Sequence, residues 1–135
     1  MIDSDVRLLL NWPFSNVTSD GELECSHPRG CGTFPKVISK YRGEDGLGSL
    51  ERIIYKMTNL SATNIGLKDR GVIKEGAFAD IVMFDARNTK DNSTFSNSTL
   101  QSEGIDSVWV NGTRVLSNGD FTGELPGRIL LKNKE

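Results

Sequence analysis

Residues 66–85 read GLKDRGVIKEGAFADIVMFD, and the pattern of the chain changes within this stretch. Before it, the apolar residues of segment 50–57 recur with the period of a helix. Inside it, glycines flank a tight corner, and the apolar run 81–84 is typical of a strand that is buried on both faces. The sequence therefore predicts a helical half that ends near Gly66 and a β-rich half after it.

The first half begins with a predicted helix over residues 3–12. Its acidic head suits the positive end of a helix dipole, and Pro13 cannot continue it. Residues 16–18 are a candidate for a short strand, and residues 21–35 are rich in Gly, Pro and Ser. We therefore expect a helix, a strand and then a long loop.

Two further helices and a helical turn are predicted before the change of pattern. Pro35 suits the first turn of one helix. Ser49 is a natural N-cap for the strongest helix in the chain. A short helical piece over residues 61–65 is expected to end at Gly66, the usual place for a C-terminal glycine.

The second half carries a hairpin signal. Asn111-Gly112 lies between the apolar runs 105–110 and 113–116, and this dipeptide is the strongest short-range hairpin signal. Residues 87–103 are polar and predict a long excursion, and residues 128–131 predict a last short strand. Turns and short strands are thus expected to dominate after Gly66.

Composition limits the classes of partner. The chain has 135 residues and a net charge of −2 without a cluster of Lys and Arg, which argues against nucleic acid. No apolar run approaches the roughly 18 residues that span a bilayer. The chain has only two cysteines, which is typical of a reducing compartment. We expect a soluble, cytoplasmic protein without a membrane partner.

The loop at residues 18–35 gathers the only histidine and both cysteines. Cys25, His27 and Cys31 could bind zinc, but a closed zinc site needs a fourth ligand. A disulfide between the cysteines is compatible with the short loop, but a reducing compartment argues against it. The remaining alternatives are a functional loop in which Asp20 is followed by His27 and Arg29, or an Asx-turn that Asp20 makes with Gly21.

The opening stretch belongs to a longer pattern. Residues 56–62 and 66–85, with the hairpin 108–115, resemble the C-terminal signature of the amidohydrolase superfamily. Ser61 stands where that pattern commonly has proline. The segment HPRGCGTFPKVISKY at 27–41, together with Ser19-Asp20-Gly21 and residues 121–128, is similar to the N-acyl-D-amino-acid deacylases, or D-aminoacylases.

The resemblance implies an α/β plus β fold. Residues 1–66 would be the C-terminal end of a (β/α)8 amidohydrolase barrel, supplying its last strand and helices. Residues 67–135 would be the C-terminal share of a small β-sandwich. The implied enzyme is a zinc-dependent hydrolase that cleaves the amide bond of N-acyl-D-amino acids.

The resemblance also implies roles for three residues. Asp20 would be the catalytic proton shuttle, with a second role as a metal ligand. Arg29 would bind the α-carboxylate of the substrate through its guanidinium fork. His27 is a weaker candidate for substrate binding, and we expect it to order the loop instead. Cys25 and Cys31 are expected to be loop residues without a catalytic role.

A complete barrel takes roughly 250 residues, and a chain with one histidine lacks the usual metal ligands. We therefore expect this chain alone to bind no zinc and to be inactive. A complementing chain, or self-association through open strand edges, would cover its exposed edges. The alternatives are a non-catalytic β-rich interaction module, or a fragment of another amidohydrolase such as a dihydroorotase or hydantoinase.

Overall fold

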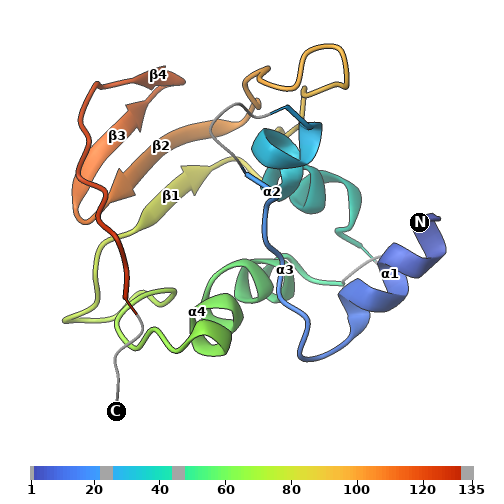
Figure 1. Cartoon of the computed structure of the whole chain (residues 1–135), viewed down its shortest axis with the longest axis horizontal. Coiled ribbons are helices and arrows are strands. Elements are labelled where there is room, and N and C mark those ends of the chain that lie inside the picture. Colours follow the sequence, from blue (N-terminus) through green and yellow to red (C-terminus); the bar gives the residue numbers. More distant parts are fainter. Residues whose placement is uncertain (1, 22–25, 44–47, 132–135) are drawn as a thin grey trace.

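The computed structural model describes residues 2–21, 26–43 and 48–131. Helices occupy one side of the molecule and a sheet occupies the other, with β1 nearest the helices (Figure 1). The helices are α1 (Asp3–Asn11), α2 (Pro28–Lys40), α3 (Leu50–Met57) and α4 (Asn59–Ile65). The strands are β1 (Ile81–Phe84), β2 (Ile105–Val110), β3 (Thr113–Ser117) and β4 (Asp120–Phe121). No helix within the described ranges is long and apolar enough to cross a membrane.

Helices α1, α3 and α4 confirm the sequence predictions. Helix α1 ends at Asn11, ahead of Pro13. The Ser49 hydroxyl accepts a hydrogen bond from the backbone of Arg52 and caps α3. Helix α4 starts two residues earlier than expected, and it ends at Gly66, whose φ of 82° is left-handed. In each of these elements the local signal and the tertiary packing agree.

Helix α2 begins at Pro28, earlier than predicted. The prediction of a loop over residues 21–35 is therefore wrong for residues 28–35. Pro28 occupies the first turn and His27 caps it, while Pro35 lies buried inside the helix. Glycine normally disfavours a helix, but Gly32 is buried here against a neighbouring loop. A Cβ at Gly32 would collide with the side chains of Asp91 and Ser93. Tertiary packing therefore overrides the weak local helix propensity.

The predicted strand at residues 16–18 is not formed. Val17 is buried, and its amide donates to the carbonyl oxygen of Lys56 at 3.1 Å instead of to a strand. Ser61, which replaces the expected proline, donates to that same carbonyl oxygen at 2.9 Å. The segment has no neighbouring strand among the described residues, and a strand needs a ladder partner.

The sheet is antiparallel, with the strand order β1-β2-β3-β4. The hairpin prediction is confirmed, because Asn111 and Gly112 both have positive φ, 50° and 83°, as a type I′ turn requires. Strand β1 forms where expected, but the prediction that both its faces are buried is wrong. Ile81, Val82 and Met83 are exposed. A strand is buried on both faces when other layers pack on both sides of its sheet, and the described residues do not provide them for β1. The predicted strand at residues 128–131 is absent.

The buried core lies between the helices. It comprises Val17, Val37, Ile38, Tyr41 and Ile53, with Phe84 at the end of β1 packed against it. Ile53, from the predicted stripe of α3, is fully buried. The core therefore joins α2 and α3 to the segment that carries Asp20.

Lys56 is a buried cation on the inner side of α3. Its Nζ donates to the carbonyl oxygens of Trp12 at 2.6 Å and Ser15 at 2.7 Å. Burial lowers the pKa of Lys56, since the charged form loses its hydration. These bonds attach the turn that follows α1 to helix α3, and this turn leads directly into Val17.

Asp3 ties α1 to α2, and its contribution to stability is expected to depend on pH. Its carboxylate accepts from Lys40 at 2.6 Å and from Arg7 at 2.8 Å, and these bonds lower its pKa from 3.8 to about 2. A lowered pKa stabilises the fold above pH 3.8, and this contribution is lost as the pH falls towards about 2. The difference in urea midpoint between the chain and Asp3→Asn should therefore shrink between these pH values.

Asp5→Asn is the matched control for this measurement, because Asp5 is also exposed and lies in the same helical turn. The stabilisation by Asp3 should also weaken in about 1 M salt, since exposed ion pairs are screened. A midpoint difference that stays constant from neutral pH to pH 2 would contradict the assignment.

Candidate active-site segment

The structure brings Asp20 and Arg29 together. Asp20 follows the buried Val17, and Arg29 lies in the first turn of α2. An Arg29 Nη2 donates to Asp20 Oδ2 at 2.5 Å, and both side chains are about two-thirds exposed, at 65% and 67%. A carboxylate able to accept a proton thus lies beside a guanidinium able to bind a carboxylate.

His27 has a structural position at the start of α2. Its Nδ1 accepts a hydrogen bond from the backbone amide of Arg29 at 3.0 Å and caps the helix. Its ring packs edge-on against Phe95, with the ring centroids 5.0 Å apart. Because the cap holds the amide of Arg29, His27 helps to position the residue that pairs with Asp20.

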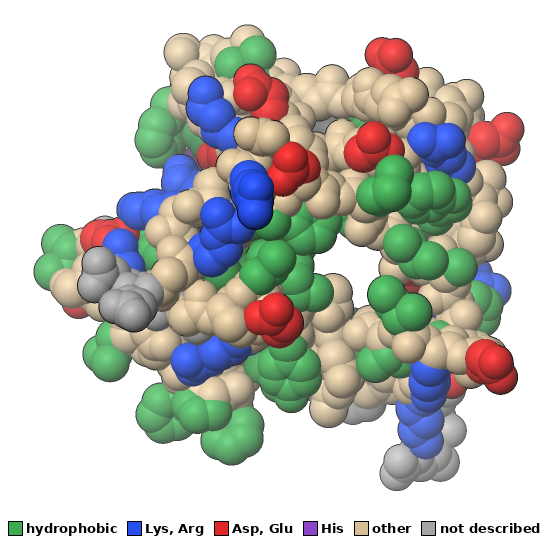
Figure 2. Space-filling view, turned by 180° about the vertical axis from the view of Figure 1, so that it is seen from behind, with side chains coloured by type: hydrophobic (Ala, Val, Ile, Leu, Met, Phe, Trp, Pro, Cys, Tyr) green, Lys and Arg blue, Asp and Glu red, His purple; other side chains and the backbone are tan. Residues whose placement is uncertain are grey.

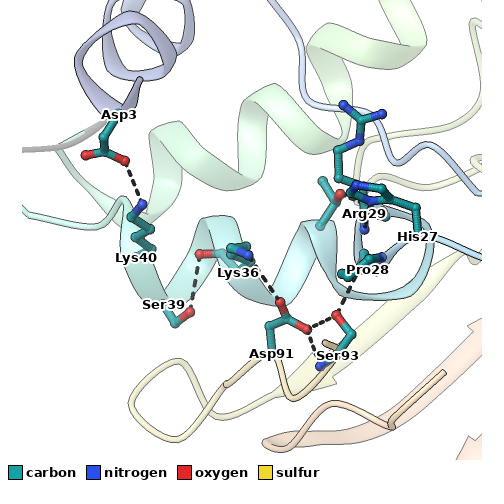
Figure 3. A network of polar contacts seen from close by, with 10 residues as sticks. Asp3, His27, Pro28, Arg29, Lys36, Ser39, Lys40, Asp91 and Ser93 are labelled. Carbon is teal, nitrogen blue, oxygen red and sulfur yellow. Dashed lines mark hydrogen bonds and ion pairs between the residues drawn. The ribbon is translucent and has the colours of Figure 1, made fainter. Parts of the chain in front are cut away.

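A loop from the second half supports this end of α2 (Figure 3). The Ser93 hydroxyl donates to the carbonyl oxygen of Pro28 at 3.2 Å. The Asp91 carboxylate accepts from the Ser93 amide at 2.9 Å and lies 3.7 Å from Lys36 Nζ. The side chain of Asp91 is only 8% exposed. Arg29 points away from this loop, so the contacts leave its guanidinium accessible.

Sequence reasoning missed Asp91, Ser93 and Phe95, because residues 87–103 were interpreted only as a polar excursion. Asp91 and Ser93 form an Asx-type turn, which the spacing Asp-x-Ser indicates. The buried Gly32 provides the other signal, since a glycine inside a helix commonly marks a close approach. A small hollow of about 120 Å³ lies between this turn and α2, lined by His27, Arg29 and Lys36 among others.

The described residues do not form a metal centre. No group of three or more His, Cys, Asp or Glu side chains that could hold a metal ion occurs in ranges 2–21, 26–43 and 48–131. The zinc and disulfide alternatives for the local cluster depend on Cys25, which lies outside those ranges. Cys31 lies on α2 rather than in a loop. The donor set near Asp20 therefore does not fit a metal ion without ligands from elsewhere.

Comparison with known families identifies the group to which these features belong. A model of the amidohydrolase family matches residues 4–116, which include Asp20, Arg29 and the supporting loop. The chain belongs to the amidohydrolase family. Among curated relatives, D-aminoacylase of Alcaligenes xylosoxydans xylosoxydans is 41% identical over 134 residues. N-acyl-D-aspartate deacylase of the same organism is 43% identical over 133 residues.

Solved amidohydrolase structures share the backbone arrangement. A D-aminoacylase mutant in complex with copper chloride matches 96% of this chain, with a TM-score of 0.88 and 40% identity. A second D-aminoacylase structure, described for its binuclear metal centre, matches 92% of this chain with a TM-score of 0.85. N-acyl-D-glutamate deacylase from Bordetella bronchiseptica, complexed with zinc and a phosphonate inhibitor, matches 69% of this chain with a TM-score of 0.63.

The coverage is unequal in the two directions. The matches extend over 98% of this chain but only 28% of D-aminoacylase, and over 96% of this chain but 26% of N-acyl-D-aspartate deacylase. The chain therefore spans little more than a quarter of the length of the curated relatives it matches. The homologous structures bind zinc or copper, whereas the described part of this chain supplies no such cluster.

Proposed function

We propose that this chain is the C-terminal portion of a metal-dependent hydrolase that cleaves the amide bond of N-acyl-D-amino acids. Residues 1–66 would complete a (β/α)8 barrel, and residues 67–135 would contribute to a small β-sandwich. The observation that carries the proposal is the ion pair of Asp20 with Arg29, within a chain about 40% identical to D-aminoacylases.

In this proposal Asp20 holds and moves the proton. Its carboxylate accepts a proton from the attacking water and passes it to the nitrogen of the leaving amine. The exposed position of Asp20 allows both partners to reach it. A general base must lie within hydrogen-bond reach of the proton it abstracts, and substrate binding would have to provide that geometry.

Arg29 would bind and orient the substrate. Its guanidinium already binds one carboxylate, that of Asp20, at 2.5 Å. The carboxylate of an N-acyl-D-amino acid has the same charge and shape, so it can compete for the same donors. His27 would position Arg29 through the helix cap rather than bind the substrate.

Metal ions enter the proposal only through ligands outside this chain. The relatives include a zinc complex and a binuclear metal centre, and zinc in such hydrolases activates water or polarises a carbonyl. Asp20 alone cannot hold a metal ion, because zinc requires three or four protein ligands. We therefore expect the 135-residue chain to have no deacylase activity without a metal-binding partner.

The proposal is tested with a chimaera, in which this chain replaces the matching 134 residues of Alcaligenes D-aminoacylase. The zinc-loaded chimaera should hydrolyse an N-acetyl-D-amino acid. The separate chain with added zinc should release no more amine than its own Asp20→Asn variant. A folded, zinc-loaded chimaera without activity would contradict the assignment, and so would activity of the separate chain.

A further inference from the structure

The chain contains two Asn-Gly dipeptides, and each forms the two-residue turn of a β-hairpin. Asn111-Gly112 joins β2 to β3, and Asn118-Gly119 joins β3 to β4. The φ angles are 50° and 83° in the first pair and 51° and 86° in the second, as type I′ turns require. The two sites share their residue types and their φ angles, so a difference in their chemistry must come from their surroundings.

Asn-Gly is the dipeptide in which the backbone attacks an asparagine side chain most readily. The nitrogen of the following peptide bonds to the side-chain Cγ, ammonia leaves, and a five-membered imide forms. Glycine favours this ring closure because it has no Cβ to hinder the approach. The reaction needs a side-chain amide that can turn towards the peptide and a peptide N–H that a base can reach.

The Asn111 side chain cannot turn in this way without breaking two hydrogen bonds. Its Oδ1 accepts from Arg70 Nη2 at 2.5 Å, and its Nδ2 donates to the carbonyl oxygen of Pro126 at 2.7 Å. The nitrogen that would attack, that of Gly112, donates to the carbonyl oxygen of Ala79 at 2.9 Å. Three hydrogen bonds must therefore open before the ring can close, and this requirement slows the reaction.

The Asn118 side chain has no such restraint. It is exposed, and its amide makes no hydrogen bond within ranges 2–21, 26–43 and 48–131. The Gly119 nitrogen has no partner in the same ranges, because it lies in the turn between the paired residues Ser117 and Asp120. Both reacting groups of this dipeptide are therefore available.

Other atoms hold the β3–β4 turn in place. The backbone nitrogen of Asn118 donates to the carbonyl oxygen of Asp106 at 2.7 Å, and Gln101 Nε2 donates to the carbonyl oxygen of Gly119 at 2.5 Å. Figure 2 shows a hollow between the sheet and the helices, and neither Asn-Gly pair lines it. The difference between the two sites is therefore local to their own turns.

We propose that Asn118-Gly119 is a site of spontaneous deamidation, and that the hydrogen bonds around Asn111 protect the second Asn-Gly pair from the same reaction. The Gly119 nitrogen bonds to Cγ of Asn118, and its proton passes through solvent to the amide, which leaves as ammonia. Water then opens the imide at either carbonyl, which gives aspartate or isoaspartate. The reaction consumes only water, so it does not depend on the proposed hydrolase activity.

The isoaspartate product changes the length of the turn. The backbone then runs through the former side chain and contains one additional carbon. The two-residue turn aligns Leu116 with Phe121 and Ser117 with Asp120, and a longer link does not fit type I′ geometry. Strand β4 should therefore separate from β3 in this form. Its isolation by ion exchange allows a direct test: the β3–β4 amides should exchange at least tenfold faster than in the unmodified chain.

Peptide mapping of the 135-residue chain after incubation at mildly alkaline pH tests the proposal. Trypsin cleaves after Arg114, so the two sites fall in separate peptides. The peptide with Asn118 should gain the mass of one deamidation at least tenfold faster than the peptide with Asn111, since three hydrogen bonds protect the latter. In denaturant the two rates should agree within about threefold, because the local sequences then decide.

A native ratio below threefold would overturn the proposal, and so would a ratio that is equally large in denaturant. Arg70→Lys removes the fork that holds Asn111 Oδ1, so it should raise the rate at Asn111 at least threefold and leave Asn118 within about twofold. Arg87→Lys, at an exposed arginine, should change neither rate. An equal rise at both sites in Arg70→Lys would indicate general loosening and overturn the assigned protection.

Discussion

Asp20→Asn in the zinc-loaded chimaera is expected to lower kcat by about 10²- to 10⁴-fold, the usual contribution of a general acid–base residue. Asparagine keeps the size of the side chain but cannot accept the proton. The exposed carboxylate of Asp20 is not part of the buried core, so the variant should remain folded. The measurement is steady-state hydrolysis of an N-acetyl-D-amino acid, with circular dichroism and metal content determined for each variant.

Two further variants are needed to attribute a loss of kcat to proton transfer by Asp20. Asp120→Asn removes an exposed carboxylate from β4, on the far edge of the sheet, and should leave kcat unchanged. Arg29→Lys keeps the charge beside Asp20 but removes the fork, so its main effect should be on KM. If Asp20→Asn kept more than one-tenth of kcat, Asp20 would not be the proton shuttle. If Arg29→Lys lowered kcat equally, Asp20 would matter mainly through its ion pair.

The turn and the helix ends that depend on one or two adjacent residues could be predicted from the sequence. The Asn111-Gly112 turn needs positive φ at two residues, and few other dipeptides supply it. Ser49 and Gly66 mark the ends of helices α3 and α4 because caps depend on adjacent backbone groups. The pairing of Asp20 with Arg29 agrees with the hypothesis of a shared site, although their catalytic roles remain predictions.

The remaining errors come from contacts between segments that are distant in the sequence. Helix α2 extends from Pro28 through Gly32 with residues 91–93 packed against it, and Gly32 marks a close approach without showing which segment makes it. Residues 16–18 are not a strand, and β1 is exposed, because pairing and burial depend on neighbours that local patterns do not supply.

Arg70→Met is expected to destabilise the 135-residue chain by about 2–4 kcal/mol, because it breaks a largely buried network of charged hydrogen bonds. Arg70 is only 9% exposed, pairs with Asp80, and donates to Asn111 Oδ1 at 2.5 Å. Its guanidinium also lies over the Phe78 ring, 4.3 Å from the centroid. Chemical denaturation, monitored by circular dichroism, would measure the change in the free energy of unfolding.

The expected loss is large because Asn111 couples three segments. The backbone nitrogen of Asn111 donates to Asp80 Oδ1 at 2.9 Å, and its side-chain Nδ2 donates to the carbonyl oxygen of Pro126 at 2.7 Å. Removing Arg70 leaves Asp80 and Asn111 without their shared donor. The corner after Gly66, the β2–β3 turn and the segment at Pro126 should then loosen together.

Controls separate this network from the loss of any surface arginine. Arg87→Met removes an exposed arginine and should change the free energy of unfolding by less than about 0.5 kcal/mol. Arg70→Lys keeps the charge without the fork, so an intermediate loss is expected, and it provides a measurable variant if Arg70→Met does not fold. Equal effects of Arg70→Met and Arg87→Met would show that the network does not hold the corner. In that case the hydrophobic contacts of the sheet would have to fix the stretch where the chain turns from helices to strands.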